Sequence, residues 1–166
     1  MSGSIDSRFL QLVNSNIGIA YKVCRIYFRE PDDQADVLQE MMYQLWRSFS
    51  SFDQRSKFST WMYSVCLNTA LTYKKKSSKH LATAMALEHE QIPEPAARRD
   101  EETISALYKA IDVLSPINKA IILLYLEDLS YEEIAQITGL SKSNVSVRLV
   151  RAKKELQNLL KNTINS

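Results

Sequence analysis

The 166 residues are enough for one ordinary domain or two small ones, so length alone does not decide the domain count. Hydrophobic residues make up 45% of the chain and charged residues 24%, while glycine occurs only 3 times, which favours a helical globular protein. A net charge of +2 is too small to indicate nucleic-acid binding by the chain as a whole, and no apolar run reaches the roughly 18 residues of a membrane span. The N-terminal MSGSIDSRF has no signal-peptide core, so we expect a cytoplasmic protein without membrane insertion.

Three amphipathic helices are predicted in the first half of the chain. Apolar side chains recur at helical spacing in NIGIAYKVCRIYFRE, and Pro31 then ends that segment. A broad apolar stripe from Asp32 to Phe49 predicts a second helix packed on a core. The third helix is expected over roughly 60–76, where it ends in three lysines. These lysines begin the first of two basic patches, and the second runs from Lys142 to Lys161.

A change of composition then predicts a domain boundary. Residues 77–103 contain EHEQIPEPAARRDEE, which is polar and rich in proline, and we interpret them as a linker with one loose helical turn near its start. Fully extended, a linker of this length spans roughly 90 Å. Two further helices are expected, around 104–114 and after Ser115. No strand is predicted, so the expected fold class is all-α, with two small helical domains joined by a flexible linker.

The stretch LSYEEIAQITGLSKSNVSVRLVRAKKEL has the spacing of a helix, a sharp turn and a second helix. Ser130 and Glu133 are three residues apart, as in a capping box that begins a helix. Gly139 stands where the chain must turn, so we expect a positive φ there, and Ser141 can cap the second helix. The pattern favours a helix-turn-helix unit over a helix hairpin whose basic face is only solvated.

The second helix of this unit has distinct inward and outward faces. Its apolar stripe recurs at steps of three and four: Val145, Leu149, Ala152, Leu156 and Leu159. At 100° per residue, the opposite face carries Ser143, Val147, Val150, Arg151 and Lys154, flanked by Asn144, Ser146 and Arg148. Such a face is expected to enter a DNA major groove, with serine, asparagine and arginine on phosphates or base edges and the two valines near thymine methyl groups.

The first domain places aromatic residues among cations. Phe52, Phe58, Trp61, Tyr63 and Tyr73 alternate with Arg55, Lys57 and Lys74 to Lys76. Bases of single-stranded nucleic acid stack on aromatic rings, at roughly 1–3 kcal/mol each. Aromatic residues at helical spacing also form cores, and we expect Trp46 and Trp61 to be largely buried. Asn68, an amide in an apolar helix, either pairs with a base edge or is a satisfied buried amide.

Two blocks of the sequence resemble a known family. DVLQEMMYQLW with SFDQRSKFSTWMYSVCLNTAL looks like region 2 of the sigma-70 superfamily, and LSPINKAIILLYLEDLSYEEIAQITGLSKSNVSVRLVRAKKEL looks like its region 4. Their order and the short linker resemble the extracytoplasmic-function (ECF) group of bacterial sigma factors. The resemblance implies a region 2-like bundle over 8–76, a linker over 77–103 and a region 4-like helix-turn-helix domain over 104–162. It implies an RNA polymerase sigma factor that binds core polymerase and reads and melts promoters.

The resemblance also assigns roles to residues. In the family, the helix bearing D-x-x-Q-E meets the β′ clamp helices of polymerase, which points to Asp36, Gln39 and Glu40. A flipped base of the minus-ten element is captured in the single-stranded non-template strand, which points to Phe52, Asp53, Lys57, Phe58 and Asn68, with Lys74 and Lys75 near phosphates. The duplex minus-thirty-five element would be read by Ser143, Asn144, Val147, Arg148, Arg151 and Lys154. Many members have arginine where this chain has Ser146, which leaves more of the task to the three cations. The β flap of polymerase and an anti-sigma factor are further expected partners.

The alternatives to a sigma factor are a conventional helix-turn-helix regulator and an enzyme such as a nuclease or recombinase. A conventional helix-turn-helix regulator would bind duplex DNA without polymerase, but it needs a dimerisation helix or a ligand pocket. A nuclease or recombinase lacks support, since the chain has no metal-ligand spacing and no Gly-rich phosphate loop. Cys24 and Cys66 lie in apolar runs and are predicted to be buried free thiols. We therefore expect neither catalysis nor a metal or other cofactor.

Overall fold

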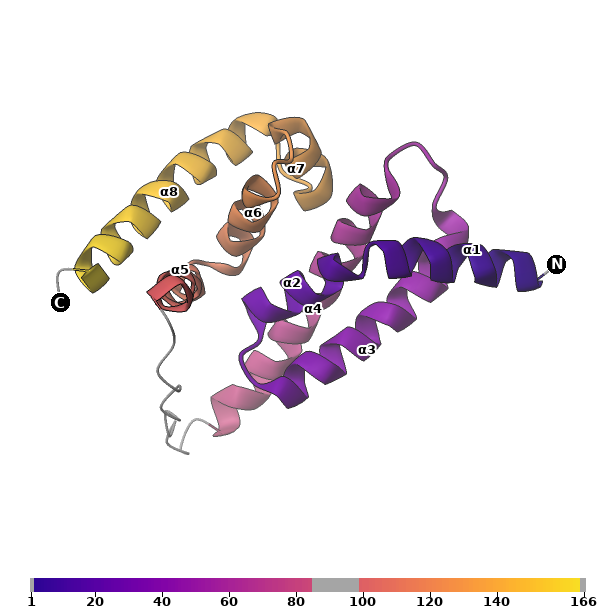
Figure 1. Cartoon of the computed structure of the whole chain (residues 1–166), viewed down its shortest axis with the longest axis horizontal. Helices are drawn as coiled ribbons and strands as arrows, with labels where there is room; N and C mark the ends of the chain where they lie inside the picture. Colours follow the sequence, from indigo (N-terminus) through magenta and orange to yellow (C-terminus); the bar gives the residue numbers. More distant parts are fainter. Residues whose placement is uncertain (1, 85–98, 165–166) are drawn as a thin grey trace. The chain divides into compact units, whose positions relative to one another are not determined.

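The computed structural model describes residues 2–84 and 99–164 (Figure 1). Within these ranges the chain forms eight α-helices and one short 3-10 helix, and no β-strand. It divides into two compact units, Met1–Lys74 and Lys75–Ser166. The prediction of an all-α fold is confirmed. None of the described helices is long and apolar enough to cross a membrane.

The first unit is a helical bundle. Its elements are α1 (Ser2–Ser15), α2 (Ile17–Tyr27), α3 (Pro31–Ser48), the 3-10 helix η1 (Phe49–Ser51) and α4 (Phe58–Ala84) as far as Lys74. Helix α1 was not predicted, although Phe9 and Val13 sit at helical spacing and are buried. Helix α4 continues to Ala84, eight residues beyond the expected end at Lys76. Of the loose turn expected near Leu81 to Leu87, the first four residues belong to α4, and the other three lie outside the described part of the chain.

Side chains from two other helices close the end of α2. Gln34 Nε2 on α3 donates to the carbonyl oxygen of Phe28 at 2.7 Å, and Lys74 Nζ on α4 donates to that of Tyr27 at 3.0 Å. The Lys74 ammonium also lies 5.3 Å from the centre of the Phe28 ring. Carbonyl groups at a helix end have no partner within the helix, so these bonds satisfy them and fix the three helices at one end of the unit.

The core of the first unit contains both cysteines as free thiols, as predicted. Cys24 on α2 and Cys66 on α4 are buried, and the Cys24 thiol lies 3.7 Å from the sulfur of Met41 on α3. Desolvation raises the pKa of Cys24 from 9.0 to about 11. Desolvation, followed by the nearby Cys24, raises the pKa of Cys66 to about 12. Both thiols therefore stay protonated in the folded protein and serve as core side chains.

These thiols predict a loss of stability in alkali. Between about pH 9 and 11 the unfolded chain ionises both thiols while the folded chain does not, so stability present below pH 9 is lost as the pH rises. Each thiol lowers the free energy of unfolding by about 1.4 kcal/mol per pH unit in this window. Urea unfolding at pH 8, 9 and 10 measures the slope. The Cys24→Ala/Cys66→Ala variant should show a shallower slope, and an unchanged slope would contradict the assignment.

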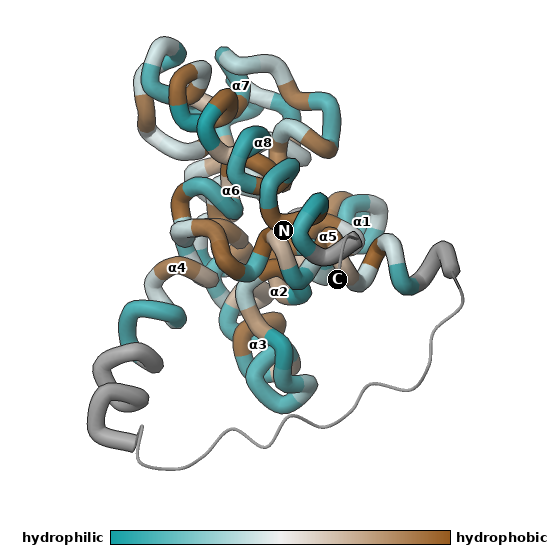
Figure 2. Tube along the Cα trace, turned by 90° about the vertical axis from the view of Figure 1, so that its left-hand side faces the viewer, coloured by the Kyte–Doolittle hydropathy of each residue, from teal (hydrophilic) through white to brown (hydrophobic). Residues whose placement is uncertain are grey.

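The second unit is built around one long helix. Its elements are α5 (Arg99–Val113), α6 (Pro116–Leu126), α7 (Tyr131–Thr138) and α8 (Lys142–Ile164). Helix α8 packs against each of the other three. Hydrophobic and hydrophilic residues alternate along it, as expected of an amphipathic helix (Figure 2). Ser115 Oγ accepts a hydrogen bond from the Asn118 backbone N–H at 3.4 Å and so caps α6.

Candidate nucleic-acid interface

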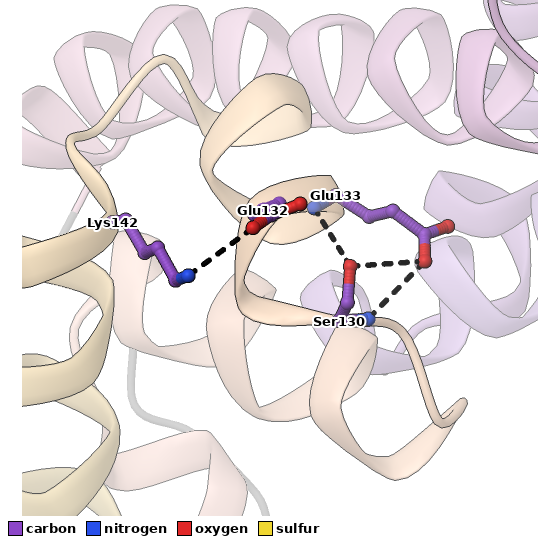
Figure 3. Close-up of polar contacts among 4 residues, drawn as sticks. All are labelled: Ser130, Glu132, Glu133 and Lys142. Carbon is purple, nitrogen blue, oxygen red and sulfur yellow. Dashed lines mark hydrogen bonds and ion pairs between the residues drawn. The ribbon is translucent and has the colours of Figure 1, made fainter.

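Helices α7 and α8 form the predicted helix-turn-helix, and local side chains fix its two helix starts. Ser130 Oγ accepts from the Glu133 backbone N–H at 3.1 Å, and the Ser130 backbone N–H donates to Glu133 Oε1 at 3.3 Å (Figure 3). These two bonds complete the capping box of α7. Helix α7 ends at Gly139, whose φ of 78° is left-handed as expected. Ser141 Oγ then accepts from the Asn144 backbone N–H at 3.1 Å and caps α8.

The turn is also bridged by charge. Lys142, the first residue of α8, lies 3.2 Å from a carboxylate oxygen of Glu132 on α7 (Figure 3). Both side chains are well exposed, so the pair contributes at most about 1 kcal/mol. Its position nevertheless links the starts of the two helices that must keep a fixed angle.

Helix α8 presents the two faces that the sequence predicts. Val145, Leu149 and Ala152 are 0% exposed. Opposite them lies the outward face of α8, which consists of five exposed residues: Ser143, Val147, Val150, Arg151 and Lys154. Polar side chains stand at the helix start and cations further along, which suits base edges and phosphates respectively.

Arg148 differs from the other predicted contacts of α8. Its Nε donates to Asn144 Oδ1 at 3.1 Å, and its Nη1 donates to Asn118 Oδ1 on α6 at 3.4 Å. The side chain is half-buried and lies on the flank of α8 beside α6, away from the centre of the outward face. In this conformation both Arg148 and Asn144 belong to a polar bridge between two helices. While the bridge is formed, Arg148 Nε and Nη1 and Asn144 Oδ1 are engaged within the protein.

An exposed acidic face runs along α3. Asp36, Gln39 and Glu40 are all exposed and lie within one turn on the same side of the helix. Gln44 Nε2 donates to Glu40 Oε1 at 2.9 Å. Desolvation raises the pKa of the Tyr73 phenol on α4, and the negative charges of Asp36, Asp33 and Glu40 raise it further. Several carboxylates therefore act together at this end of the unit, which suits a basic partner.

The loop between α3 and α4, residues 49–57, is anchored by aromatic rings. We call this segment the minus-ten loop, after the promoter element to which the sequence resemblance assigns it. Four rings lie within 6.5 Å of one another, centre to centre, in every pairing: Phe49, Phe52, Phe58 and Trp61. Phe58 is 9% exposed, whereas Phe52 and Trp61 are half-buried. Phe52 and Phe58 thus hold the loop against α4. Of these two, only Phe52 has part of its ring exposed at the surface.

The expectation that both tryptophans are largely core is wrong. Trp46 is 49% exposed, with its ring edge against Phe9 of α1 at 5.3 Å between centres. Trp61 is half-buried in the aromatic cluster. The apolar stripe of α3 is narrower than the sequence suggests, because Val37, Met41 and Leu45 alone are fully buried along it. Trp46 lies outside that line.

The tip of the minus-ten loop is held by local polar contacts. The Arg55 backbone N–H donates to Asp53 Oδ1 at 3.1 Å, and Arg55 Nε lies 3.2 Å from Asp53 Oδ2. Gln54 adopts a positive φ of 64°. With its amide oxygen turned toward α1, Gln54 accepts from Arg8 Nη1 at 3.1 Å and from Nη2 at 2.6 Å. The role of Arg8 was missed, and no local pattern could reveal a partner so far away in sequence.

The remaining predicted residues of the first unit fall into two groups. Asn68 and Lys75 are exposed and seven residues apart, so they lie on one side of α4, and Lys57 is exposed beside the loop. Exposure excludes the alternative that Asn68 is a buried amide. Lys74 is instead engaged with Tyr27 and Phe28 at the end of α2. The first group is exposed at the surface, and Lys74 is not brought to the same face.

The contact between Arg8 and Gln54 predicts how the minus-ten loop loosens. Arg8→Met keeps an unbranched apolar stem and removes the guanidinium donors, and one hydrogen bond contributes about 1 kcal/mol. We expect amide exchange in residues 49–57 to become about fivefold faster, measured by mass spectrometry. Arg151→Met, which removes an exposed arginine from the other unit, is the matched control and should leave the loop unchanged. Equal amide-exchange rates in the wild type and both variants would show that the contact between Arg8 and Gln54 does not hold the loop.

Comparisons with known proteins cover both units. The chain is 30% identical over 136 residues to RNA polymerase sigma factor SigV of Bacillus subtilis, covering 81% of this chain and 80% of that protein. It is 30% identical over 139 residues to the ECF RNA polymerase sigma-E factor of Escherichia coli K12, covering 76% of this chain and 73% of that protein. The fold resembles that of the sigma factor RpoE of Bartonella quintana, solved with the anti-sigma factor NepR, with a TM-score of 0.78 at 23% identity over 93% of this chain and 97% of that one. It also resembles CnrH, solved with the cytosolic domain of CnrY, with a TM-score of 0.69 at 21% identity over 95% and 90%.

A helix-turn-helix whose second helix exposes cations defines a DNA-binding protein. The family models for Sigma-70 region 2 and Sigma-70 region 4 match residues 12–80 and 104–156. The chain belongs to the sigma-70 family and is an RNA polymerase sigma factor of the ECF group. The alternative of a regulator that works without polymerase is not favoured.

Proposed function

We propose that this sigma factor binds core RNA polymerase through the acidic face of α3. The exposure of Asp36, Gln39 and Glu40 on one turn carries the assignment. Carboxylates on a rigid helix can meet a basic helical partner such as the β′ clamp helices, and electrostatic attraction would speed their encounter. The chain itself catalyses no reaction in this scheme and instead directs the polymerase.

The minus-ten loop and the exposed side of α4 capture the melted non-template strand. The four-ring cluster holds the loop before DNA arrives, so little ordering entropy remains to be lost on binding. Phe52, Asp53 and Lys57 lie in the loop or at its edge. Asn68 and Lys75 extend the surface along α4, where an amide suits a base edge and an ammonium suits a phosphate. Phe58 supports this surface from below by packing against Phe52. Lys74 would have to give up its contacts with Tyr27 and Phe28 at the end of α2 before it could join the surface.

The second unit reads the duplex minus-thirty-five element through the outward face of α8 and meets the β flap of polymerase. Ser143, at the start of α8, faces base edges, and Arg151 and Lys154 face phosphates or guanine. We assign residues 8–76 to the polymerase-binding and minus-ten domain and 104–162 to the minus-thirty-five domain, with 77–103 joining them. Because α4 continues to Ala84 and α5 begins at Arg99, 14 residues lie between the two helices, and a chain of that length can extend to roughly 50 Å.

An anti-sigma factor is the expected regulator of this protein. RpoE and CnrH, which share its fold, were each solved with another protein bound, NepR or the cytosolic domain of CnrY. A regulator that covers the acidic face of α3 would block access to polymerase. We place the protein in the bacterial cytoplasm, where polymerase and promoter DNA are found.

Run-off transcription from a genomic promoter library tests this function. Bacterial core polymerase is assayed with and without the protein, and promoter-specific transcripts should appear only when the protein is present. If none appear while the protein alone shifts duplex DNA at moderate salt, the sigma activity is excluded and DNA binding without polymerase takes its place.

A further inference from the structure

The outward face of α8 carries two apolar side chains at its centre. Val147 is 49% exposed and Val150 is 63% exposed, whereas Val145 on the opposite face is 0% exposed. Three residues apart, Val147 and Val150 lie on adjacent lines of the same helix face. Valine is a weaker helix former than most residues because its branched side chain loses rotamer freedom. Stability of α8 therefore gives no reason for valine at two exposed positions.

The surroundings of the valines indicate what covers them. Ser143 lies one turn before Val147, and the exposed cations Arg151 and Lys154 each lie one turn after a valine. An apolar centre beside cations complements a polyanion that also offers apolar groups. In the major groove the base edges present donors, acceptors and one apolar group, the C5 methyl of thymine. Thymine-bearing duplex DNA fits this face on both counts.

The side chain of Arg148 does not cover the two valines at the centre of the outward face of α8. Its guanidinium is held by Asn144 and by Asn118 of α6, on the flank of α8. With that long side chain drawn aside, the two valines and Ser143 lie closest to the centre of the face. Val147 is the sixth residue of α8, within the N-terminal part with which recognition helices contact base edges.

We propose that Val147 and Val150 read the methyl groups of thymines on neighbouring base pairs of the minus-thirty-five element. The assignment rests on the proposed insertion of α8 into the major groove. Three residues advance about 4.5 Å along a helix axis, close to the spacing of about 3.4 Å between base pairs. Two adjacent thymine methyls therefore match the two valines better than widely separated ones.

Deoxyuridine substitution tests the assignment because it removes only the methyl group. Holoenzyme is assembled from core polymerase and the full-length protein, and its affinity is measured on the promoter obtained from the library with each minus-thirty-five thymine replaced in turn. The wild-type protein should lose about fourfold in affinity at each of two thymines on neighbouring base pairs and nothing at the others.

The valine variants assign each methyl to a side chain. In the Val147→Ala holoenzyme, deoxyuridine at one of the two thymines should no longer reduce the affinity. In the Val150→Ala holoenzyme, the same should hold for the other thymine. Val113→Ala is the matched control, since Val113 is a 62% exposed valine on α5 of the same unit. It should keep the fourfold effect at both positions.

The outcomes separate this inference from the proposed function. A holoenzyme that protects the minus-thirty-five element but shows no methyl effect, or an element without thymine, overturns the role of the valines and leaves the sigma function standing. A methyl effect that both alanine variants retain also overturns it. If the holoenzyme makes specific transcripts without protecting any upstream element, the insertion of α8 fails and the valine assignment fails with it.

Discussion

Replacing Asp36, Gln39 and Glu40 together by alanine is expected to reduce promoter-specific transcription at least 100-fold. Each of the three side chains is exposed, so their loss leaves no buried group unpaired. Alanine is the best helix former, which should preserve α3. Truncating a charge at the centre of an interface commonly costs about 2 kcal/mol or more, and two such losses, roughly 4 kcal/mol if additive, would remove most of the affinity for polymerase even before the Gln39 amide is counted.

The comparison needs a control for charge. The triple variant removes two negative charges, which by itself strengthens attraction to DNA. Glu102→Gln/Glu155→Gln removes the same charge from two exposed positions outside the first unit, and it should transcribe like the wild type. Polymerase affinity is measured with labelled sigma factor, and circular dichroism checks the fold. Full activity in the triple variant would exclude the acidic face of α3 as the docking surface.

Leu149→Ala is expected to unfold the second unit while leaving the first intact. Leu149 is 0% exposed on α8, the helix against which α5, α6 and α7 all pack. Removing a buried leucine side chain costs about 2–5 kcal/mol. A core of this size rarely supplies more than about 5 kcal/mol, so the folded fraction should fall sharply. Minus-thirty-five recognition would be lost with it.

Hydrogen exchange resolves the two units within one molecule. In Leu149→Ala, protection should fall by at least 30-fold, about 2 kcal/mol, throughout α6 to α8 and remain unchanged in α2 to α4. Val147→Ala is the matched control for stability, because it removes fewer atoms from an exposed position two residues earlier. If both units lose protection equally, they form one cooperative structure and the division into independent cores is incorrect.

The sequence predicted the helix-turn-helix well because its signals are local. Ser130 and Glu133 are three residues apart, and Ser141 lies three residues before the N–H that it accepts from. Gly139 is the residue type that a left-handed turn requires. Each of these choices is decided within one helical turn, so neighbours in the sequence contain the information. The two faces of α8 followed from periodicity alone.

The first unit was predicted less completely because its function depends on contacts distant in sequence. In the first unit Arg8 of α1 contacts Gln54, which is 46 residues later in the sequence. The second unit has one such contact among its predicted residues, between Arg148 and Asn118 of α6. The neighbouring sequence does not distinguish a buried aromatic ring that anchors a loop from an exposed ring that could stack on a base. Phe58, which is buried against Phe52, is an example. Trp46 was misplaced for the same reason, since the width of a buried stripe is set by the helices that cover it.

Trp46 and Trp61 lie in different environments, so their intrinsic fluorescence can report on two different parts of the first unit. The chain contains only these two tryptophans, and both belong to the first unit. Trp46 lies half in solvent on α3, the helix assigned to polymerase, whereas Trp61 lies in the four-ring cluster under the minus-ten loop. A single-tryptophan protein made with Trp61→Phe would emit at long wavelength and shift when polymerase covers α3. Its counterpart with Trp46→Phe would emit at shorter wavelength and report the capture of a base, so the two steps of initiation could be timed separately without an attached dye.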